Sequence, residues 1–293
     1  MSSRPEWLKQ KSPNAKVLQE MENIFKDLSL HTVCKSANCP NRGKCFENKT
    51  ATFMILGNIC TRGCRFCAVD KGCAMPLDVE EPYHVAQACK TLGLKHIVVT
   101  SVTRDDLKDG GAQHFAETVK EIRKLNPATT IELLIPDLKG NWNALKKIVE
   151  AKPDIINHNI ETTPVLYSEV RPNAVYERSV ELLRQVKIMD SKIYTKSGMM
   201  LGLGEVYEDV IGVMDDLIEI NCDIITLGQY LRPSKEHIPI KEFVSPEKFQ
   251  EFKNIALEKG FKFVASAPFV RSSYKAFEGM KELMKFKSMN NPG

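Results

Sequence analysis

Short apolar runs alternate with amphipathic segments along most of the chain, from residue 52 onward. The apolar runs show no regular alternation with polar residues, which is typical of strands covered on both faces. The segments between them repeat apolar residues at helical spacing, and several follow Pro, Gly or Asn at cap positions. We therefore predict strands at residues 52–57, 96–102, 130–136, 154–160, 193–201 and 223–231. The predicted helices between these strands are 82–92, 112–125, 142–151, 176–189 and 207–220.

Six successive strand–helix units predict a parallel sheet with right-handed crossovers. This is two units short of a complete eight-fold barrel, so the expected fold class is α/β, a partial (β/α)6 TIM-like barrel. A doubly wound open sheet fits the same alternation. We divide the chain into an N-terminal extension (1–50), the barrel (51–235) and a C-terminal extension (236–293). The C-terminal extension holds a helix candidate at 246–258 and a strand-like run at 261–265.

Composition narrows the class of protein without identifying it. Hydrophobic residues make up 43% and charged residues 27% of the 293 residues, which is the ordinary globular range. No apolar run approaches the roughly 18 residues of a membrane span, and the N-terminus lacks the apolar core of a signal peptide. The net charge of +4 is small, and the basic residues of the chain are interspersed with acidic ones. This pattern argues against binding to nucleic acid. We expect no membrane or nucleic-acid partner, a monomer, and a cytoplasmic location, with a mature organellar form as the alternative.

The nine cysteines are distributed unevenly. Six of them fall between Cys34 and Cys67, which in a chain without a signal peptide favours metal binding or redox chemistry over disulfides. Cys89 and Cys222 lie at helix and strand positions and are predicted to be buried small hydrophobes, whereas Cys73 has no assigned role. The chemistry is therefore expected at the six clustered thiols.

Cys60, Cys64 and Cys67 form a C-x3-C-x2-C motif, here named the downstream triplet, directly after the first predicted strand. In parallel α/β folds, reactive groups gather in the loops at the carboxyl ends of strands. A [4Fe–4S] cluster normally takes four thiolates, so three would leave one iron open to a substrate or cofactor. The two arginines inside the triplet would offset the negative charge of a cluster. The alternative is a zinc site with Cys73 as fourth ligand.

Cys34, Cys39 and Cys45 form a C-x4-C-x5-C motif, here named the upstream triplet. Asn, Pro and Gly residues within it predict a loop. A zinc knuckle that uses His31 would fit this triplet taken alone. Two neighbouring triplets, with a TIM-like pattern after them, weigh against this interpretation.

The downstream triplet, with Phe66 directly before its last cysteine, resembles the signature of radical SAM enzymes. The chain as a whole closely resembles lipoyl synthases. Both triplets together with a terminal Arg-Ser-Ser-Tyr sequence make this resemblance specific, and no motif position departs from the family pattern. The matching segments are residues 4–9, 32–66, 101–107, 157–162, 198–205 and 271–274.

The resemblance implies two [4Fe–4S] clusters and S-adenosylmethionine (SAM). The downstream triplet would hold a radical cluster whose open iron binds the amino and carboxylate groups of SAM, and reduction would cleave SAM to a 5′-deoxyadenosyl radical. The upstream triplet would hold an auxiliary cluster with Ser273 as its fourth protein ligand. The family inserts sulfur at C6 and C8 of an octanoyl chain on a lysine, and the auxiliary cluster is consumed as the sulfur donor.

Further residues are expected to contact SAM. Asn159 and Glu161, at the end of the fourth predicted strand, suit ribose or aminoacyl contacts, and Arg171 would pair with the SAM carboxylate. The alternatives are surface polar groups or helix caps, and for Arg171 a surface ion pair. The full set of expected contacts is Phe66, Ser101, Thr103, Asn159, Glu161, Arg171 and Met200.

The implied partners are octanoylated lipoyl carrier domains, namely the E2 subunits of 2-oxoacid dehydrogenases and the H protein of glycine cleavage. A ferredoxin- or flavodoxin-type reductant and an iron–sulfur carrier protein would supply electrons and a new cluster. Two other functions compete with this one. The first is another two-cluster radical SAM sulfurtransferase, such as a biotin synthase or methylthiotransferase relative, which would lack the upstream triplet. The second is a zinc-stabilised binding protein.

Overall fold

An eight-stranded sheet forms the centre of the computed structural model, which describes residues 5–9, 14–48 and 50–290. All strand pairs from β2 to β10 are parallel, and β1 pairs antiparallel with β2. Arg4, in the first matching segment, lies outside the described residues. In their order across the sheet, the strands are β1 His31–Thr32, β2 Thr52–Ile55, β5 His96–Ser101, β6 Thr130–Leu134, β7 Ile155–Asn157, β8 Tyr194–Leu201, β9 Ile224–Gln229 and β10 Phe263–Ser266.

The predicted partial barrel is confirmed, because all six predicted strands are present in one curved parallel sheet. The strand-like run predicted at 261–265 forms β10, which extends the sheet beyond the six predicted units. It does so because Val264 and its neighbours pair with β9. The sequence pattern does not predict β1, since two residues carry no periodicity. β1 and β10 form the two edges of the sheet.

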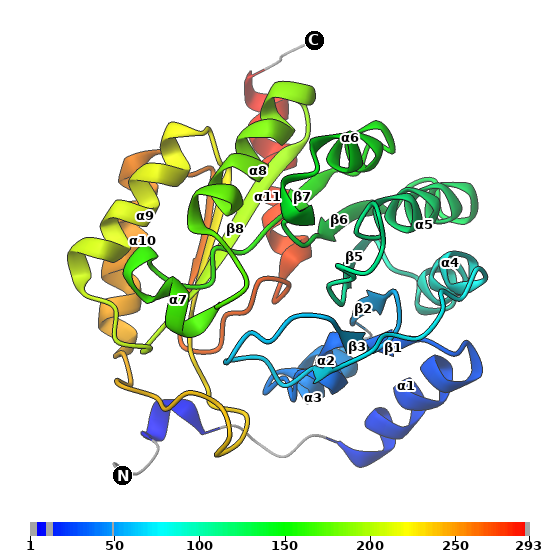
Figure 1. Cartoon of the computed structure of the whole chain (residues 1–293), viewed down its shortest axis with the longest axis horizontal. Coiled ribbons are helices and arrows are strands. Elements are labelled where there is room, and N and C mark those ends of the chain that lie inside the picture. Colours follow the sequence, from blue (N-terminus) through cyan, green and yellow to red (C-terminus); the bar gives the residue numbers. More distant parts are fainter. Residues whose placement is uncertain (1–4, 10–13, 49, 291–293) are drawn as a thin grey trace.

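Helices α4, α5, α6, α8, α9 and α10 cover the outer side of this sheet, as Figure 1 shows. The ends of the six predicted helices lie within one residue of the observed ones. The α-helices of the described residues are α1 Ala15–Asp27, α2 Val33–Ser36, α3 Arg42–Glu47, α4 Glu81–Leu92, α5 Ala112–Leu125, α6 Trp142–Glu150, α7 Tyr167–Val170, α8 Tyr176–Met189, α9 Tyr207–Glu219, α10 Pro246–Lys259 and α11 Ala276–Asn290. None of them has both the length and the apolar character needed to cross a membrane.

The residues at the ends of α10 illustrate how local sequence sets the element boundaries. The Ser245 side chain accepts a hydrogen bond from Lys248 N at 3.3 Å, and Pro246 occupies the first helical position. Gly260 ends the helix with a φ of 107°, a left-handed conformation that other residues rarely adopt. These signals explain why the helix is predictable although its apolar stripe is weak.

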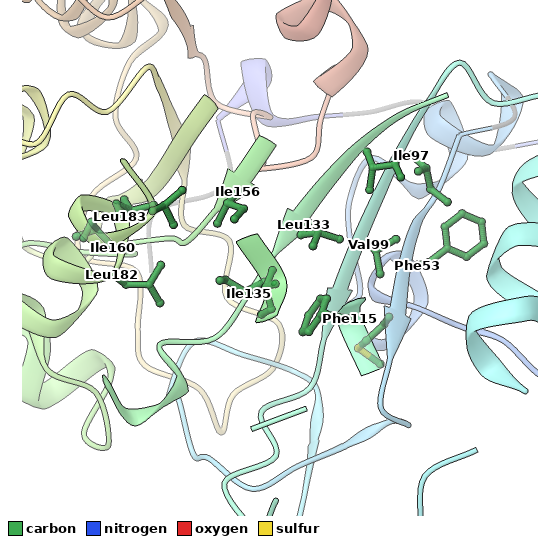
Figure 2. Packing of buried hydrophobic residues seen from close by; sticks show 14 of the residues in the cluster. Phe53, Ile97, Val99, Phe115, Leu133, Ile135, Ile156, Ile160, Leu182 and Leu183 are labelled. Atoms are coloured by element: carbon green, nitrogen blue, oxygen red, sulfur yellow. The ribbon is translucent and has the colours of Figure 1, made fainter. Parts of the chain in front are cut away.

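The two faces of β5 have different environments. Ile97 and Val99 point outward into the hydrophobic core, where Phe115 of α5 packs (Figure 2). His96 and Val98 point to the opposite face and line the interior cavity described below. The alternation follows from the period of two in a strand, and it explains why both faces are buried.

The N-terminal and C-terminal extensions both pack against the barrel. In α1, the Phe25 ring lies 5.7 Å from that of Phe46 and 5.9 Å from that of Phe53 in β2. In α11, Met280 and Leu283 share a small apolar cluster with the barrel strands β7 and β9. The predicted boundaries at residues 50 and 235 therefore divide the sequence into segments, and both extensions pack directly against the barrel.

A buried ion pair crosses the inside of the barrel. Lys196 of β8 donates to both carboxylate oxygens of Glu132 of β6, at 2.8 and 3.1 Å, and Asn157 of β7 donates to the same carboxylate at 3.0 Å. His96 of β5 lies 3.6 Å from it. Although burial disfavours the charged form, the Lys196 ammonium holds the pKa of Glu132 at about 2. One carboxylate therefore connects strands of the sheet from inside the barrel.

We predict that Glu132→Gln lowers the free energy of unfolding by about 3 kcal/mol or more, because it leaves the Lys196 charge buried without a partner. The double variant Glu132→Gln/Lys196→Met is expected to recover most of this loss, since it removes both charges. Urea unfolding followed by circular dichroism measures the difference. A double variant that is less stable than the single one would contradict the ion-pair explanation.

Candidate active site

One cavity of about 920 Å³ lies inside the barrel and brings together residues from all three segments of the chain. All six cysteines of the two triplets line it, together with Ser273 of the C-terminal extension. The expected SAM contacts line the same cavity, namely Phe66, Ser101, Thr103, Asn159, Glu161, Arg171 and Met200. The residues singled out from the sequence therefore face a single space, although they are spread over more than 200 positions.

The downstream triplet occupies the loop that follows β2. Cys60 ends β3 (Ile59–Cys60), which pairs with β4 (Asp70–Lys71) to form a short parallel ribbon around the loop. Cys67 N donates to Cys64 O at 3.2 Å, which closes a tight turn between these two cysteines. Burial raises the pKa of the Cys64 thiol, and it raises that of Cys67 to about 12. These thiols are therefore protonated at neutral pH until a metal displaces their protons.

The upstream triplet lies on α2, α3 and the turn between them. Cys34 belongs to α2, Cys45 to α3, and Cys39 N donates to Cys34 O at 3.2 Å. Asn38 makes the turn possible, because it adopts a φ of 48° that Asn tolerates better than most residues. Burial raises the pKa of Cys34 to about 12 and that of Cys45 to about 11.

The cysteines outside the two triplets lie away from this cavity. All nine cysteines are free thiols, as the expectation of metal binding over disulfides requires. Cys89 and Cys222 are buried, which confirms that prediction. Cys73 is exposed and is not among the cavity residues.

A zinc ion and a four-iron cluster require different arrangements of thiols. Within the part of the chain that the structure describes, no three His, Cys, Asp or Glu side chains converge closely enough to hold one metal ion. The ligands of a zinc ion all lie within about 2.3 Å of a single centre, whereas the thiolates of a four-iron cluster bind different iron atoms and stand farther apart.

The two triplets lie toward opposite ends of β2. Thr52, the first residue of this strand, donates from Oγ1 to Ser273 Oγ at 2.8 Å and lies beside Cys34. The downstream triplet follows the last residue, Ile55. Three residue steps of about 3.3 Å make the strand about 10 Å long. Thr52 and Met54 of β2 both line the cavity, so the cavity runs along this strand.

Three contacts fix the segment that carries the two serines. Asn41 Nδ2 of the N-terminal extension donates to Phe269 O at 2.7 Å, and Asn159 Nδ2 of the barrel donates to Ser272 Oγ at 2.7 Å. Gly228 of β9 lets the segment approach, because a Cβ at this position would lie 2.1 Å from Val270 O. The serine segment thus contacts both of the other segments.

Buried polar atoms without partners lie among the expected SAM contacts. Among the described residues, Ser101 Oγ, Asn159 Oδ1 and Arg171 Nε have no hydrogen-bond partner. Such groups are costly unless a ligand or water satisfies them. Arg171 Nη1 donates to the main-chain oxygens of Asn159 and Ile160, at 3.0 and 3.2 Å. Because Arg171 is only 8% exposed, the alternative of a surface ion pair is wrong.

Glu161 adopts an unusual backbone conformation at this site. Its φ is 72°, and its main chain bridges to β8, where Glu161 O accepts from Met200 N at 2.9 Å. Its carboxylate accepts from Asn159 Nδ2 at 3.0 Å. Burial raises the pKa of Glu161, and the positive charge of Arg171 opposes this effect. A strained, buried carboxylate at a cavity wall is typical of a binding site.

His158 is a cavity residue that the sequence analysis did not single out. Its Nδ1 donates to Ile135 O at 2.8 Å, so its Nε2 carries a lone pair, and this atom has no partner among the described residues. Burial and the charge of Arg171 lower the pKa of His158 to about 4. The side chain is therefore a neutral acceptor at the cavity wall. A lone histidine without a metal-like pair gives no signal for this in the sequence.

Comparisons with known proteins agree with this site. The sequence model described as the Radical SAM superfamily matches residues 54–217. The chain is 59% identical over 277 residues to the lipoyl synthase of Caldanaerobacter subterraneus subsp. tengcongensis, which covers 94% of this chain and 97% of that protein. It is 55% identical over 285 residues to the lipoyl synthase of Alkaliphilus metalliredigens, with 97% and 98% covered.

Solved structures share the fold at low sequence identity. The FeFe-hydrogenase maturase HydG from Carboxydothermus hydrogenoformans aligns with a TM-score of 0.58 and 14% identity, over 93% of this chain and 79% of that one. Methylornithine synthase aligns with a TM-score of 0.53 and 16% identity, over 89% and 87%. The match to the radical SAM sequence model, together with the fold and the cysteine-lined cavity, thus defines a radical SAM enzyme. Within that superfamily, the chain belongs to the lipoyl synthase family.

We predict that His158 makes the protein less stable in mild acid. Its folded pKa of about 4 lies below the ordinary value of 6.5, so the unfolded chain binds a proton first as the pH falls. The free energy of unfolding of the wild type should therefore decrease as the pH falls from 6.5 to 4. This decrease should be about 3 kcal/mol larger than the decrease in the His158→Gln variant. Urea midpoints measured across this range test the difference, and parallel profiles for the two proteins would refute it.

Proposed function

We propose that this enzyme, whose family forms the lipoyl cofactor by radical SAM chemistry, inserts sulfur at C6 and C8 of an octanoyl group carried on a protein lysine. One observation carries the proposal: both cysteine triplets and Ser273 line a single cavity, with the triplets toward opposite ends of β2. An acyl chain in this cavity would have one triplet on each side. A single-cluster enzyme would have no use for the upstream triplet.

The donor sets suit the cofactors that the family uses, SAM and [4Fe–4S] clusters. Cys60, Cys64 and Cys67 offer three thiols, which leaves one iron free for SAM. The upstream triplet has Ser273 beside it as a fourth, oxygen donor, held by Thr52 at 2.8 Å. When bound, the radical cluster and SAM supply the oxidant that an unactivated C–H bond requires, and the auxiliary cluster supplies sulfur. Serine is a harder and weaker iron ligand than thiolate, which suits a cluster that gives up sulfur.

The SAM-side residues of the cavity would bind and orient the cofactor. Ser101 Oγ, Asn159 Oδ1 and Arg171 Nε are polar, buried and without partners among the described residues, so polar groups of a ligand would satisfy them. Glu161 would accept from ribose hydroxyls or the aminoacyl nitrogen. Phe66, Thr103 and Met200 would enclose the remainder and exclude water, which protects a reactive radical from side reactions.

The apolar middle of the cavity would hold the acyl chain. Met54, Val98 and Leu134 line it on the inner face of the barrel, and none of them offers a hydrogen bond to a polar substrate. The chain would arrive on octanoylated lipoyl carrier domains, the E2 subunits and the glycine cleavage H protein. A ferredoxin- or flavodoxin-type reductant and an iron–sulfur carrier would supply electrons and renew the auxiliary cluster.

We predict that the anaerobically reconstituted protein is brown and holds about eight irons per chain, as two four-iron clusters require. Replacing the three cysteines of either triplet by alanine should leave about four irons. Iron and zinc analysis together with absorption spectra check this. A colourless protein with stoichiometric zinc would refute the enzyme assignment in favour of a zinc-stabilised binding protein.

We predict that Ser273→Ala preserves SAM cleavage but lowers sulfur insertion about tenfold or more, because it removes a ligand of the auxiliary cluster only. The measurement is mass spectrometry of an octanoyl-lysine peptide after incubation with SAM and dithionite. Ser272→Ala is the matched variant, since this neighbouring serine contacts Asn159 instead of Thr52. Loss of sulfur insertion in Ser272→Ala alone would assign the ligand to Ser272.

A further inference from the structure

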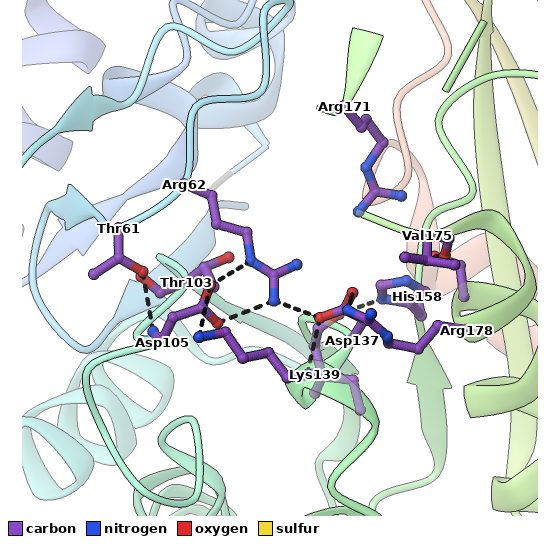
Figure 3. A network of polar contacts seen from close by, with 12 residues as sticks. Thr61, Arg62, Thr103, Asp105, Asp137, Lys139, His158, Arg171, Val175 and Arg178 are labelled. Atoms are coloured by element: carbon purple, nitrogen blue, oxygen red, sulfur yellow. Dashed lines mark hydrogen bonds and ion pairs between the residues drawn. The ribbon is translucent and has the colours of Figure 1, made fainter. Parts of the chain in front are cut away.

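Arg62 lies inside the downstream triplet, and the buried carboxylate of Asp137 and the partly exposed carboxylate of Asp105 bind its guanidinium. Arg62 Nε donates to Asp105 Oδ2 at 2.7 Å, and Nη2 donates to Asp105 Oδ1 at 3.0 Å. The same Nη2 donates to Asp137 Oδ1 at 2.6 Å. Figure 3 shows the guanidinium between the two carboxylates. The Arg62 side chain is only 4% exposed, so this is an internal ion pair with fork geometry on one side.

The two carboxylates come from separate parts of the barrel. Asp105 follows β5, and Asp137 follows β6 at the start of the short 3-10 helix η2 (Leu138–Gly140). Asp137 also accepts from Arg178 of α8 at 3.2 Å. Although burial disfavours the charged form, the Arg62 guanidinium holds the pKa of Asp137 at about 2. The network therefore ties the cysteine loop to the carboxyl ends of two neighbouring strands and, through Asp137, to α8.

Thr61 makes a second attachment beside the first. Its main-chain N and its Oγ1 both donate to Thr103 O, at 3.0 and 2.9 Å. Its Oγ1 also accepts from Asp105 N at 3.0 Å. Two consecutive residues between Cys60 and Cys64 are thus bonded to the segment after β5, and none of these bonds involves a cysteine.

The charge balance of the network argues against a purely electrostatic role. From the sequence, Arg62 and Arg65 are both expected to offset the charge of a cluster. In the structure, Asp105 and Asp137 already neutralise Arg62. Arg65 differs, because its side chain is 52% exposed and its nearest carboxylate, on Glu169, lies 3.9 Å away. The same loop thus contains one clamped arginine and one exposed arginine, which provides a matched pair for experiment.

We propose that Arg62 is a positioning residue: its ion pairs with Asp105 and Asp137 hold the downstream triplet in its metal-binding conformation before the cluster is present. This rests on the proposed assignment of the radical cluster to Cys60, Cys64 and Cys67. When the cluster binds, a preformed loop loses less conformational entropy than a disordered one. The bound cluster should therefore dissociate more slowly. Lysine cannot replace Arg62, because an ammonium lacks the planar fork that binds two carboxylates at once.

The test uses the full chain with Cys34, Cys39 and Cys45 replaced by alanine, so that all bound iron reports on the downstream triplet. Arg62→Gln, Arg62→Lys and Asp105→Asn are compared with Arg65→Gln, which removes the same charge from the same loop. Hydrogen exchange of residues 58–68 is measured on the metal-free proteins. Iron content, the rate of iron loss to a chelator, and the reduction potential are measured after reconstitution.

We expect faster exchange of the loop in the three variants at Arg62 and Asp105 and iron loss about tenfold or more faster, since each change breaks the two-bond fork between Arg62 and Asp105 that attaches the loop. Arg65→Gln should match the parent protein in both. If Arg62 acted by charge alone, Arg62→Gln and Asp105→Asn would shift the reduction potential in opposite directions with loop exchange unchanged. That result would overturn the proposal.

Two controls distinguish loss of the Arg62 ion pairs from unfolding and from a wrong cluster assignment. Each variant is also made with Cys60, Cys64 and Cys67 replaced by alanine, and retention of about four irons on the upstream triplet shows that the chain is folded. If Arg62→Gln does not fold, the partly exposed Asp105 makes Asp105→Asn the deciding variant. A parent protein that binds no iron on the downstream triplet would instead refute the cluster assignment on which the proposal rests.

Discussion

β2 separates Thr52, beside the upstream triplet, from the loop that carries the downstream triplet, and the proposed chemistry depends on both triplets facing one cavity. The strand has four residues, and its side chains divide between two faces. Phe53 and Ile55 pack in the hydrophobic core without lining the cavity, whereas Thr52 and Met54 line the cavity, and Met54 also contacts the core. The core therefore fixes the strand from one side, while the other side presents the hydroxyl that holds Ser273. A shift of one residue in register would exchange these faces and separate the serine from the upstream triplet.

A cavity remains inside the barrel, because ion pairs rather than large apolar side chains occupy other parts of the interior. One part of the interior holds the buried pair of Glu132 and Lys196, and the cysteine loop above it is tied by Arg62 to two further carboxylates. Gly198 of β8 lines the cavity without a side chain, and a Cβ there would lie 2.4 Å from Thr226 Oγ1 and 3.0 Å from Asn159 Oδ1, so these two side chains already occupy that position. Ion pairs bond strands and loops to one another without filling the barrel with large apolar side chains, so rigidity and an internal void coexist.

Structural features that depend on local sequence or on a motif can be predicted from the sequence. Features that depend on contacts between residues far apart in the chain cannot. The six strands, six helices and both triplets follow from periodicity, caps and cysteine spacing. The partners of Arg62 lie 43 and 75 positions away, so the sequence suggests a charge beside a cluster while the structure has a neutralised clamp. His158 becomes a neutral acceptor only through its burial and its bond to Ile135 O. β1 forms only because β2 offers an edge to two residues that have no pattern of their own.

Completion of the upstream site is coupled to the folding of the whole chain. Thr52 and Ser273, which meet beside this triplet, are 221 positions apart. The serine segment reaches its place through Asn41 of the N-terminal extension, Asn159 of the barrel and the space left by Gly228 of β9. These contacts join the C-terminal extension to both the N-terminal extension and the barrel. A partly folded chain would offer only the three upstream thiols, because Ser273, the proposed oxygen donor, arrives only once the C-terminal extension has packed. Under the proposed ligand assignment, geometry therefore restricts loading of a complete auxiliary cluster to the folded enzyme, in which the cavity that would receive the acyl chain already exists.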